Sequence, residues 1–268
     1  MDQNDFVLNA GEYLKTRADQ NDQPAAILIG EALFSGLITE ADDQRVLTWL
    51  RLAEGGDSAA AEILFGDYLK DGRGTAPDPA KAAKLYETWA TKGHKEAQTR
   101  LAGLYEIGLG LNQDFSQAVY WYEKAAAQDD LEANRVIARM YLEGQGTEAN
   151  LEKSLESYRR AAELGDPESQ AALGVFYSLG QGLAQDLNLA VFWWQKAAAQ
   201  GHESASHYLI SLAEANLLVE KKPAKTVKAK VEPKKAPAVK APKTPKPKNP
   251  PKTKAEKAPK EPKTPKNG

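Results

Sequence analysis

Residues 97–128, AQTRLAGLYEIGLGLNQDFSQAVYWYEKAAAQ, contain one copy of a unit that recurs along the chain. Ladders of residues spaced 36 positions apart show the recurrence. Self-similarity at a fixed period of this length is typical of stacked repeats. The sequence therefore predicts an all-α solenoid of 36-residue helix-turn-helix repeats. The clearest ladders are Tyr105, Tyr141 and Tyr177, then Gly72, Gly108, Gly144 and Gly180, and then Gly74, Gly110, Gly146 and Gly182.

Each unit has the pattern helix, turn, helix, turn. In the quoted copy, apolar residues at steps of three and four from Ala97 to Tyr105 predict an amphipathic first helix. Gly108 and Gly110 then predict its end, because glycine readily adopts the left-handed conformation of a helix stop. A short polar side chain follows in every unit and predicts the N-cap of a second helix. This capping ladder is Asp42, Asp78, Asp114, Asn150 and Asp186, whereas the second helix is stopped at Gly93, Gly165 and Gly201, with Asp129 at the same place.

The register divides the chain into a solenoid with a cap at each end and a tail. Terminal units of stacked arrays are expected to be atypical, because one of their faces meets water. The expected parts are a capping helix within 1–24, a solenoid over 25–219 and a tail over 220–268. Within the solenoid, the expected repeats are 25–60, 61–96, 97–132, 133–168 and 169–204, followed by a capping helix over 205–219.

The quoted unit resembles the Sel-one-like repeat (SLR) family, a relative of the tetratricopeptide repeat. The resemblance implies a right-handed alpha-alpha superhelical solenoid that acts as a non-catalytic adaptor between proteins. It covers about residues 25–215 and none of the tail. The residues that carry it are Leu101, Ala102, Tyr105, Gly108, Gly110, Asp114, Ala118, Trp121, Tyr122, Lys124, Ala125 and Ala126.

The same resemblance implies that the first helices line a concave face that binds a protein or peptide partner. Arg135 and Arg139 lie one helical turn apart there, so they could together bind a carboxylate or an acidic peptide. The alternative is a solvated helix face on which Glu132 or Glu143 pairs with Arg139. The candidate partner-binding residues are Asp67, Lys70, Asp71, Thr99, Glu106, Arg135, Arg139, Glu143, Ser178 and His207.

The near-neutral net charge conceals an acidic body and a basic tail. Residues 221–268 hold 17 Lys and 3 Glu, a net charge of +14, whereas residues 1–220 hold 18 Lys+Arg and 34 Asp+Glu, a net charge of −16. The tail also has 11 Pro and no aromatic residue, a composition that predicts disorder. Three roles remain open for it: nucleic-acid binding by counterion release, binding of anionic lipid or another polyanion, or a spacer. Candidate polyanion-binding residues are Lys234, Lys235, Lys243, Lys246, Lys263 and Lys266.

No motif in the sequence predicts catalysis, a metal or a cofactor. The chain has no cysteine, which excludes disulfides and thiolate sites. His202 and His207 are five residues apart, one too many for two zinc ligands on one helix face. No apolar run suggests a signal peptide or a membrane span. We therefore expect a cytoplasmic, bacterial scaffold that is not an enzyme; the alternative is a nucleic-acid-associated protein whose tail binds DNA or RNA without sequence specificity.

Overall fold

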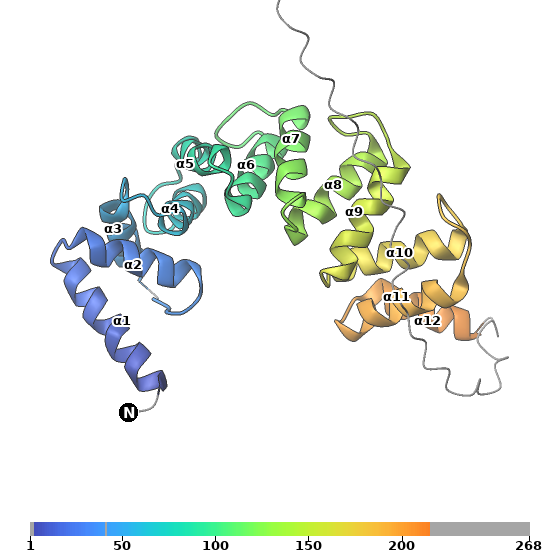
Figure 1. Ribbon diagram of the computed structural model, residues 1–268, viewed down its shortest axis with the longest axis horizontal. Coiled ribbons are helices and arrows are strands. Elements are labelled where there is room, and N and C mark those ends of the chain that lie inside the picture. The colour runs from blue at the N-terminus through green and yellow to red at the C-terminus, as the bar shows by residue number, and fades with distance from the viewer. Residues whose placement is uncertain (1–2, 41, 215–268) are drawn as a thin grey trace, which may run out of the picture. The chain divides into compact units, whose positions relative to one another are not determined.

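The computed structural model describes residues 3–40 and 42–214, and these residues form helices and the turns that join them (Figure 1). This confirms the all-α repeat fold predicted from the 36-residue ladders. None of the described helices is long and apolar enough to cross a membrane. The predicted tail over 220–268 lies outside the described residues. The helices are α1 (Gln3–Asp19), α2 (Gln23–Phe34), α3 (Asp43–Ala53), α4 (Ala59–Asp71), α5 (Pro79–Thr91), α6 (Lys95–Ile107), α7 (Phe115–Ala126), α8 (Leu131–Glu143), α9 (Leu151–Glu163), α10 (Pro167–Leu179), α11 (Leu187–Ala199) and α12 (Glu203–Glu214).

From α4 to α11 the helices form four pairs, and each pair stacks on the next. The second helix of a pair packs against its own first helix and against the first helix of the following pair. The pairs begin at residues 59, 95, 131 and 167, two positions before the boundaries drawn from the ladders. The pair α2–α3 precedes them, and the single helices α1 and α12 pack against α2 and α11. Each helix therefore buries its apolar side against sequence neighbours, as stacking requires.

The predicted capping residues begin and end the helices as expected. Asp114 Oδ1 accepts hydrogen bonds from the backbone N–H groups of Ser116 (2.9 Å) and Gln117 (3.0 Å), so it is the N-cap of α7. Gly108 ends α6 in the left-handed conformation, with φ of 71°. Gly110 serves a different purpose, because a Cβ at this position would lie 2.4 Å from the carbonyl oxygen of Pro79. The second glycine of each turn thus lets the turn approach the preceding repeat closely.

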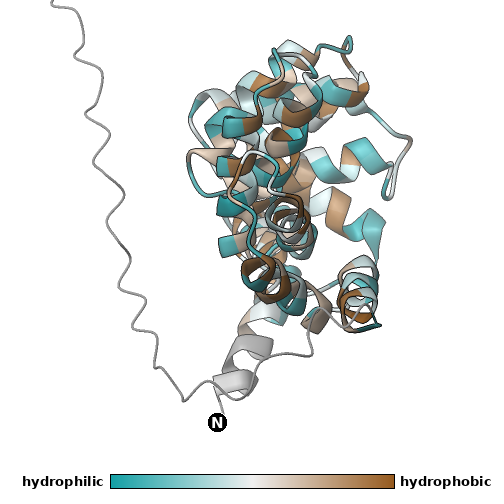
Figure 2. Ribbon diagram, turned by 90° about the vertical axis from the view of Figure 1, so that its right-hand side faces the viewer, coloured by the Kyte–Doolittle hydropathy of each residue, from teal (hydrophilic) through white to brown (hydrophobic). Residues whose placement is uncertain are grey.

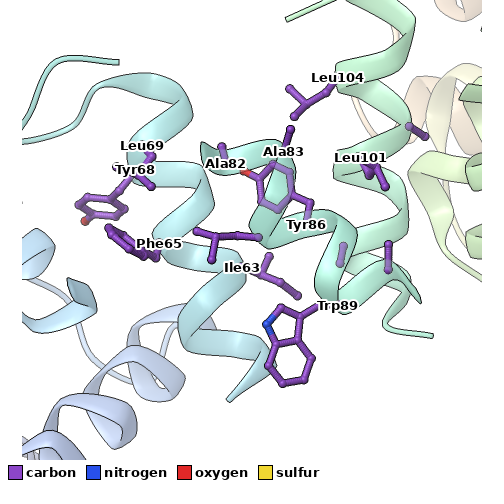
Figure 3. Close-up of a cluster of buried hydrophobic side chains, with 14 of the residues drawn as sticks. Ile63, Phe65, Tyr68, Leu69, Ala82, Ala83, Tyr86, Trp89, Leu101 and Leu104 are labelled. Atoms are coloured by element: carbon purple, nitrogen blue, oxygen red, sulfur yellow. The ribbon is translucent and has the colours of Figure 1, made fainter. Parts of the chain in front are cut away.

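Large and small side chains alternate between the paired helices. In Figure 3 the side chains of Ile63, Tyr86 and Trp89 fill the space between α4, α5 and α6. A Cβ at Gly66 would lie 2.4 Å from the Tyr86 ring, so the ring occupies the space that the glycine leaves. Most helices in Figure 2 carry hydrophobic and hydrophilic residues side by side, which is the amphipathic pattern a stacked helix needs.

The buried core is divided near α9. One apolar cluster runs from Ala18 to Tyr141, and a second, smaller one runs from Ala171 to Leu212. Between them, α9 places Ser154 at a fully buried position where α7 has Ala118. The repeat 131–166 is thus less apolar on its second helix than its neighbours are.

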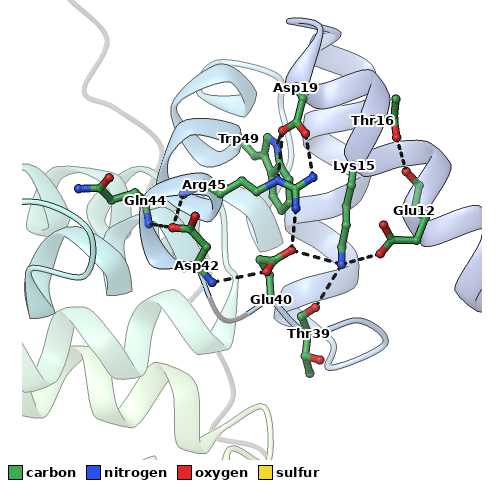
Figure 4. A network of polar contacts seen from close by, with 10 residues as sticks. All are labelled: Glu12, Lys15, Thr16, Asp19, Thr39, Glu40, Asp42, Gln44, Arg45 and Trp49. Atoms are coloured by element: carbon green, nitrogen blue, oxygen red, sulfur yellow. Dashed lines mark hydrogen bonds and ion pairs between the residues drawn. The ribbon is translucent and has the colours of Figure 1, made fainter.

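A polar network joins α1 to α3 at the start of the array (Figure 4). Trp49 Nε1 donates to Asp19 Oδ1 at 2.8 Å, and Arg45 Nη2 donates to Asp19 Oδ2 at 2.8 Å. The hydrogen bond from Arg45 holds the pKa of Asp19 below its ordinary value. Arg45 also pairs with Glu40 (3.2 Å), which Lys15 approaches at 3.4 Å. This network orients α1 on the first pair of helices.

Candidate protein-interaction surfaces

The exposed sides of α4, α6, α8, α10 and α12, here called the first-helix face, carry the predicted partner-binding residues except Thr99. Asp67 on this face holds three helices together. Tyr86 Oη of α5 donates to Asp67 Oδ1 at 2.8 Å, and Arg100 Nε of α6 donates to Asp67 Oδ1 and Oδ2 at 2.7 and 3.0 Å. Burial raises the pKa of Tyr86, which keeps its hydroxyl protonated as a donor. We call this Tyr–carboxylate–Arg arrangement a clamp.

A second clamp lies one repeat further along the stack. Tyr122 Oη donates to Glu106 Oε2 at 3.0 Å, and Arg139 Nη2 donates to Glu106 Oε1 at 2.6 Å. Burial likewise raises the pKa of Tyr122. The pairing of Arg139 with Glu132 or Glu143, considered above, is not the ion pair that the structure contains. Glu106 lies on the preceding first helix, so the clamp crosses the interface between two repeats.

The remaining predicted residues of this face do not form one site. Arg135 Nε lies 3.5 Å from Asp166 Oδ1, so the two predicted arginines face different carboxylates of the chain itself. Thr99 is only 7 % exposed, because its side of α6 packs into the stack, and it cannot serve as a surface contact. The others are dispersed: Lys70 pairs with Asp71 at 3.3 Å, Ser178 Oγ donates to the carbonyl of Val175 at 2.8 Å, and Glu143 and His207 are exposed without an ion pair among the described residues.

The described residues include neither the predicted tail lysines nor a cluster of metal-ligating side chains. Lys234, Lys235, Lys243, Lys246, Lys263 and Lys266 lie outside the described residues. Within residues 3–40 and 42–214, no three His, Asp or Glu side chains are grouped so that they could hold a metal ion. His202 has a structural contact instead, since its Nδ1 accepts a hydrogen bond from the N–H of Ala205 at 3.2 Å.

The second-helix side contains a feature that the sequence reasoning did not predict. A pocket of about 550 Å³ lies between α7 and α9, with α8 as its floor. Its floor includes Ile137 and Tyr141, which are 1 % and 5 % exposed. Ala126 of α7 and Ser157 of α9 contribute to opposite walls. An apolar floor with a polar rim is typical of a site that binds a side chain or a small ligand.

Charged side chains surround the pocket, and two of them, Glu156 and Arg159, make no hydrogen bond or ion pair with the described residues. Tyr141 Oη donates to Glu123, and Lys153 Nζ lies 3.8 Å from the same carboxylate. Arg160 Nε donates to Asp129 Oδ1 at 2.6 Å. Arg159 is exposed beside them and makes no hydrogen bond or ion pair with the described residues. The rim therefore offers one free guanidinium group.

A break in a residue ladder explains why the pocket occurs here. The 36-residue register places Trp49, Leu85, Trp121, Ser157 and Trp193 at equivalent positions. Trp121 is buried, at 8 % exposure, whereas Ser157 lines the pocket. The signal was present in the sequence as the exception within a ladder of large residues. A search for matching residues does not find it, because it consists of a mismatch.

Comparisons with known proteins agree with the repeat architecture. A family model described as Sel1 repeat matches residues 59–94, 95–130, 131–166 and 167–202, four segments of 36 residues that make up 144 of the 268 in the chain. These four segments each contain one helix pair, from α4–α5 to α10–α11. A search of curated proteins finds no match.

Two solved bacterial structures resemble the chain over most of its length. One is a protective antigen of uropathogenic Escherichia coli with an SLR fold, 30% identical, with a TM-score of 0.67, over 75% of this chain and 43% of the antigen. The chain thus spans less than half of that antigen's length. The other is a Sel1 repeat protein from Oxalobacter formigenes, 25% identical, with a TM-score of 0.66, over 78% of this chain and 88% of that protein.

Proposed function

Because the chain belongs to the Sel1 repeat family, we propose that it is a non-catalytic scaffold that binds other proteins. Proteins of this family are in general helical-repeat scaffolds for protein interactions and are generally non-enzymatic. The observation that carries the proposal for this chain is the pocket of about 550 Å³ between α7 and α9. Contact with a side chain of a protein partner is more favourable for its buried apolar floor and charged rim than contact with bulk water.

The first-helix face is a proposed second contact surface with a different character. The clamps at Asp67 and Glu106 join consecutive repeats across this face. Arg139 retains N–H groups beyond the one bound to Glu106, and Glu143 is exposed one turn further along α8. A partner that follows the solenoid would meet these groups without breaking the clamps.

The scaffold proposal is tested by capturing partners on the full chain and on a chain that ends at Glu220, with and without nuclease. We expect at least one protein to be captured by both chains and retained after nuclease treatment. Binding of that protein, once purified, is then measured by calorimetry. If every captured protein is lost after nuclease treatment, the protein-scaffold proposal is wrong.

The alternative proposal is a nucleic-acid-associated protein, and the tail composition favours it. The 17 Lys of residues 221–268 provide a dense positive charge without arginine or aromatic side chains, which suits phosphate contact without base readout. The test is binding of duplex DNA and of RNA by the full chain between about 50 and 200 mM salt, where affinity by counterion release falls steeply. The chain ending at Glu220 is the control and should not bind. Salt-independent binding, or equal binding by both chains, would contradict this proposal.

A cytoplasmic location in a bacterium completes the proposal. The two similar structures both come from bacteria, which supports the bacterial part of it.

A further inference from the structure

The pocket between α7 and α9 retains walls that, one repeat earlier, surround a tryptophan position. Ile137 corresponds to Leu101, and Tyr141 corresponds to Tyr105, each 36 residues apart. Between the walls, Ser157 replaces the buried Trp121. The groove therefore has the floor expected beneath an indole ring, and the described residues place no such ring in it.

The α7–α9 groove also lacks the hydrogen-bonded glutamine bridge that closes the end of each neighbouring groove. In the neighbouring groove, Gln128 Nε2 donates to the carbonyl of Gly93 (3.0 Å) and to Gln98 Oε1 (2.8 Å), which joins α5, α6 and α7. The groove between α9 and α11 has the same bridge, from Gln200 to Gly165 and Gln170.

In the α7–α9 groove the two glutamine positions are Asn134 and Leu164 instead. The Asn134 amide turns inward and donates to the carbonyls of Ala126 (3.2 Å) and Asp130 (2.8 Å). No bridge across the groove forms between these two residues. Loss of the large residue and loss of the bridge therefore coincide in one groove.

The charge at the rim indicates what accompanies the aromatic group. Lys153 and Arg160 already face Glu123 and Asp129, whereas Arg159 and Glu156, which also line the rim, make no hydrogen bond or ion pair with the described residues. A guanidinium group in this state favours a carboxylate. The basic tail cannot supply the aromatic group, because residues 221–268 contain no aromatic residue. The aromatic group is therefore assigned to another molecule.

We infer that this pocket binds an aromatic side chain of a partner protein, tryptophan above all, with an acidic group of the same segment next to Arg159. The inference rests on the proposed scaffold function and specifies the chemistry of the partner. An inserted aromatic ring removes a large apolar area from water, on the order of 150–250 Å² for a buried side chain. The carboxylate adds orientation rather than most of the affinity.

The test uses N-acetyl-L-tryptophan, which carries an indole and a carboxylate, as a probe on the isotope-labelled full chain. We expect saturable changes in the amide NMR signals of α7, α8 and α9. N-acetyl-L-tryptophanamide, which lacks the carboxylate, should bind several-fold more weakly, and N-acetyl-L-leucine should give no saturation. Absence of saturable changes around this pocket overturns the inference.

Two variants locate the binding. Ser157→Trp supplies the missing ring from the chain itself and should abolish the changes, with its fold checked by circular dichroism. Arg159→Gln lies on an exposed surface and leaves the packing intact. It should weaken N-acetyl-L-tryptophan several-fold and leave the amide probe unaffected. Unchanged binding by Ser157→Trp overturns the inference; if that variant does not fold, an equal effect of Arg159→Gln on both probes overturns the role of Arg159.

The partner captured on the full chain separates this inference from the scaffold proposal. If Ser157→Trp loses the partner, the pocket is its binding site. If Ser157→Trp retains the partner, the scaffold function stands and the pocket inference is wrong. If the wild-type chain captures no protein that survives nuclease treatment, the scaffold proposal itself fails.

Discussion

The grooves between α5 and α7 and between α7 and α9 have equivalent floors and opposite contents. The first is filled by Trp121 and bridged by Gln98 and Gln128, whereas the second is open at Ser157. In an array whose units contact only their neighbours, stability is a sum over interfaces. One interface can therefore give up its large residue without disturbing the packing of the others. The comparison shows how a repeat protein can form a pocket where a ladder of large residues is broken and the adjacent bridge is absent.

The interface at the open groove, like the one at the filled groove, carries a clamp on its opposite side. Glu106 of α6 and Arg139 of α8 form a clamp across the repeats that flank the groove. Ser116 Oγ also donates to the carbonyl of Gly146 at 3.2 Å, which joins α7 to the following turn. At the pocket these polar contacts join the two repeats without the ring that the filled groove also has.

The largest effect is expected when the filled groove is opened. Trp121→Ser removes a buried indole and should lower the free energy of unfolding by about 3–5 kcal/mol, the usual range for truncating a buried aromatic residue. Chemical denaturation measures it. Trp193→Ser is the matched control and should cost less, because Trp193 is only half-buried in the last groove. Equal losses for the two variants would show that burial at this ladder position does not determine its contribution.

The glutamine bridge should have the next largest effect. Gln128→Leu copies the open groove and leaves the Oε1 atom of the buried Gln98 without its donor. An unsatisfied buried acceptor costs about 1–3 kcal/mol, which denaturation of the variant can measure. The reciprocal change Leu164→Gln is the control. It should be nearly neutral, because Asn134 is shorter and its amide already has two backbone partners. A stabilisation by Leu164→Gln as large as the loss in Gln128→Leu would contradict this explanation.

Filling the open groove should stabilise the chain modestly. Ser157→Trp places an indole between walls equivalent to those around Trp121 and should raise the free energy of unfolding by about 0.5–2 kcal/mol, as cavity-filling changes commonly do. The measurement is again chemical denaturation, with Ser157→Ala as the control for loss of the hydroxyl alone. A strong destabilisation by Ser157→Trp would mean that the walls have adapted to the serine.

The sequence predicted the features that repeat and missed those that depend on how neighbouring helices face each other. Helix ends followed from local chemistry, so Asp114 and Gly108 were placed correctly. The clamps join residues 33 apart, such as Asp67 and Arg100, and this spacing has meaning only once the stacking angle is known. The same lack of geometry put Thr99 on the surface, although α6 buries it. The pocket was missed because its prediction requires the positions of the groove walls as well as the break in the 36-residue ladder.

The smallest expected effect concerns an ionisable group at the rim of the open groove that the filled groove lacks. Asp129 stands at the end of α7 with φ of 60°, at the position that Gly93 holds at the end of α5. A hydrogen bond from Arg160 holds the pKa of Asp129 below its ordinary value. A lowered folded-state pKa means that the ion pair stabilises the fold above the unfolded-state pKa, about 3.9 for aspartate, and that this contribution is lost as the pH falls through the folded value.

NMR titration of the Asp129 carboxylate should therefore give a midpoint below that of an unperturbed aspartate. Arg160→Gln should return the midpoint to the ordinary range, because it removes the donor. Arg159→Gln is the matched control: it removes the same charge from the neighbouring residue, which does not contact Asp129, and should shift the midpoint much less. If both variants shift the midpoint equally, then the general field of the rim sets the pKa, and Arg159 already contributes to it. In that case the charge of Arg159 is partly engaged before any partner carboxylate arrives.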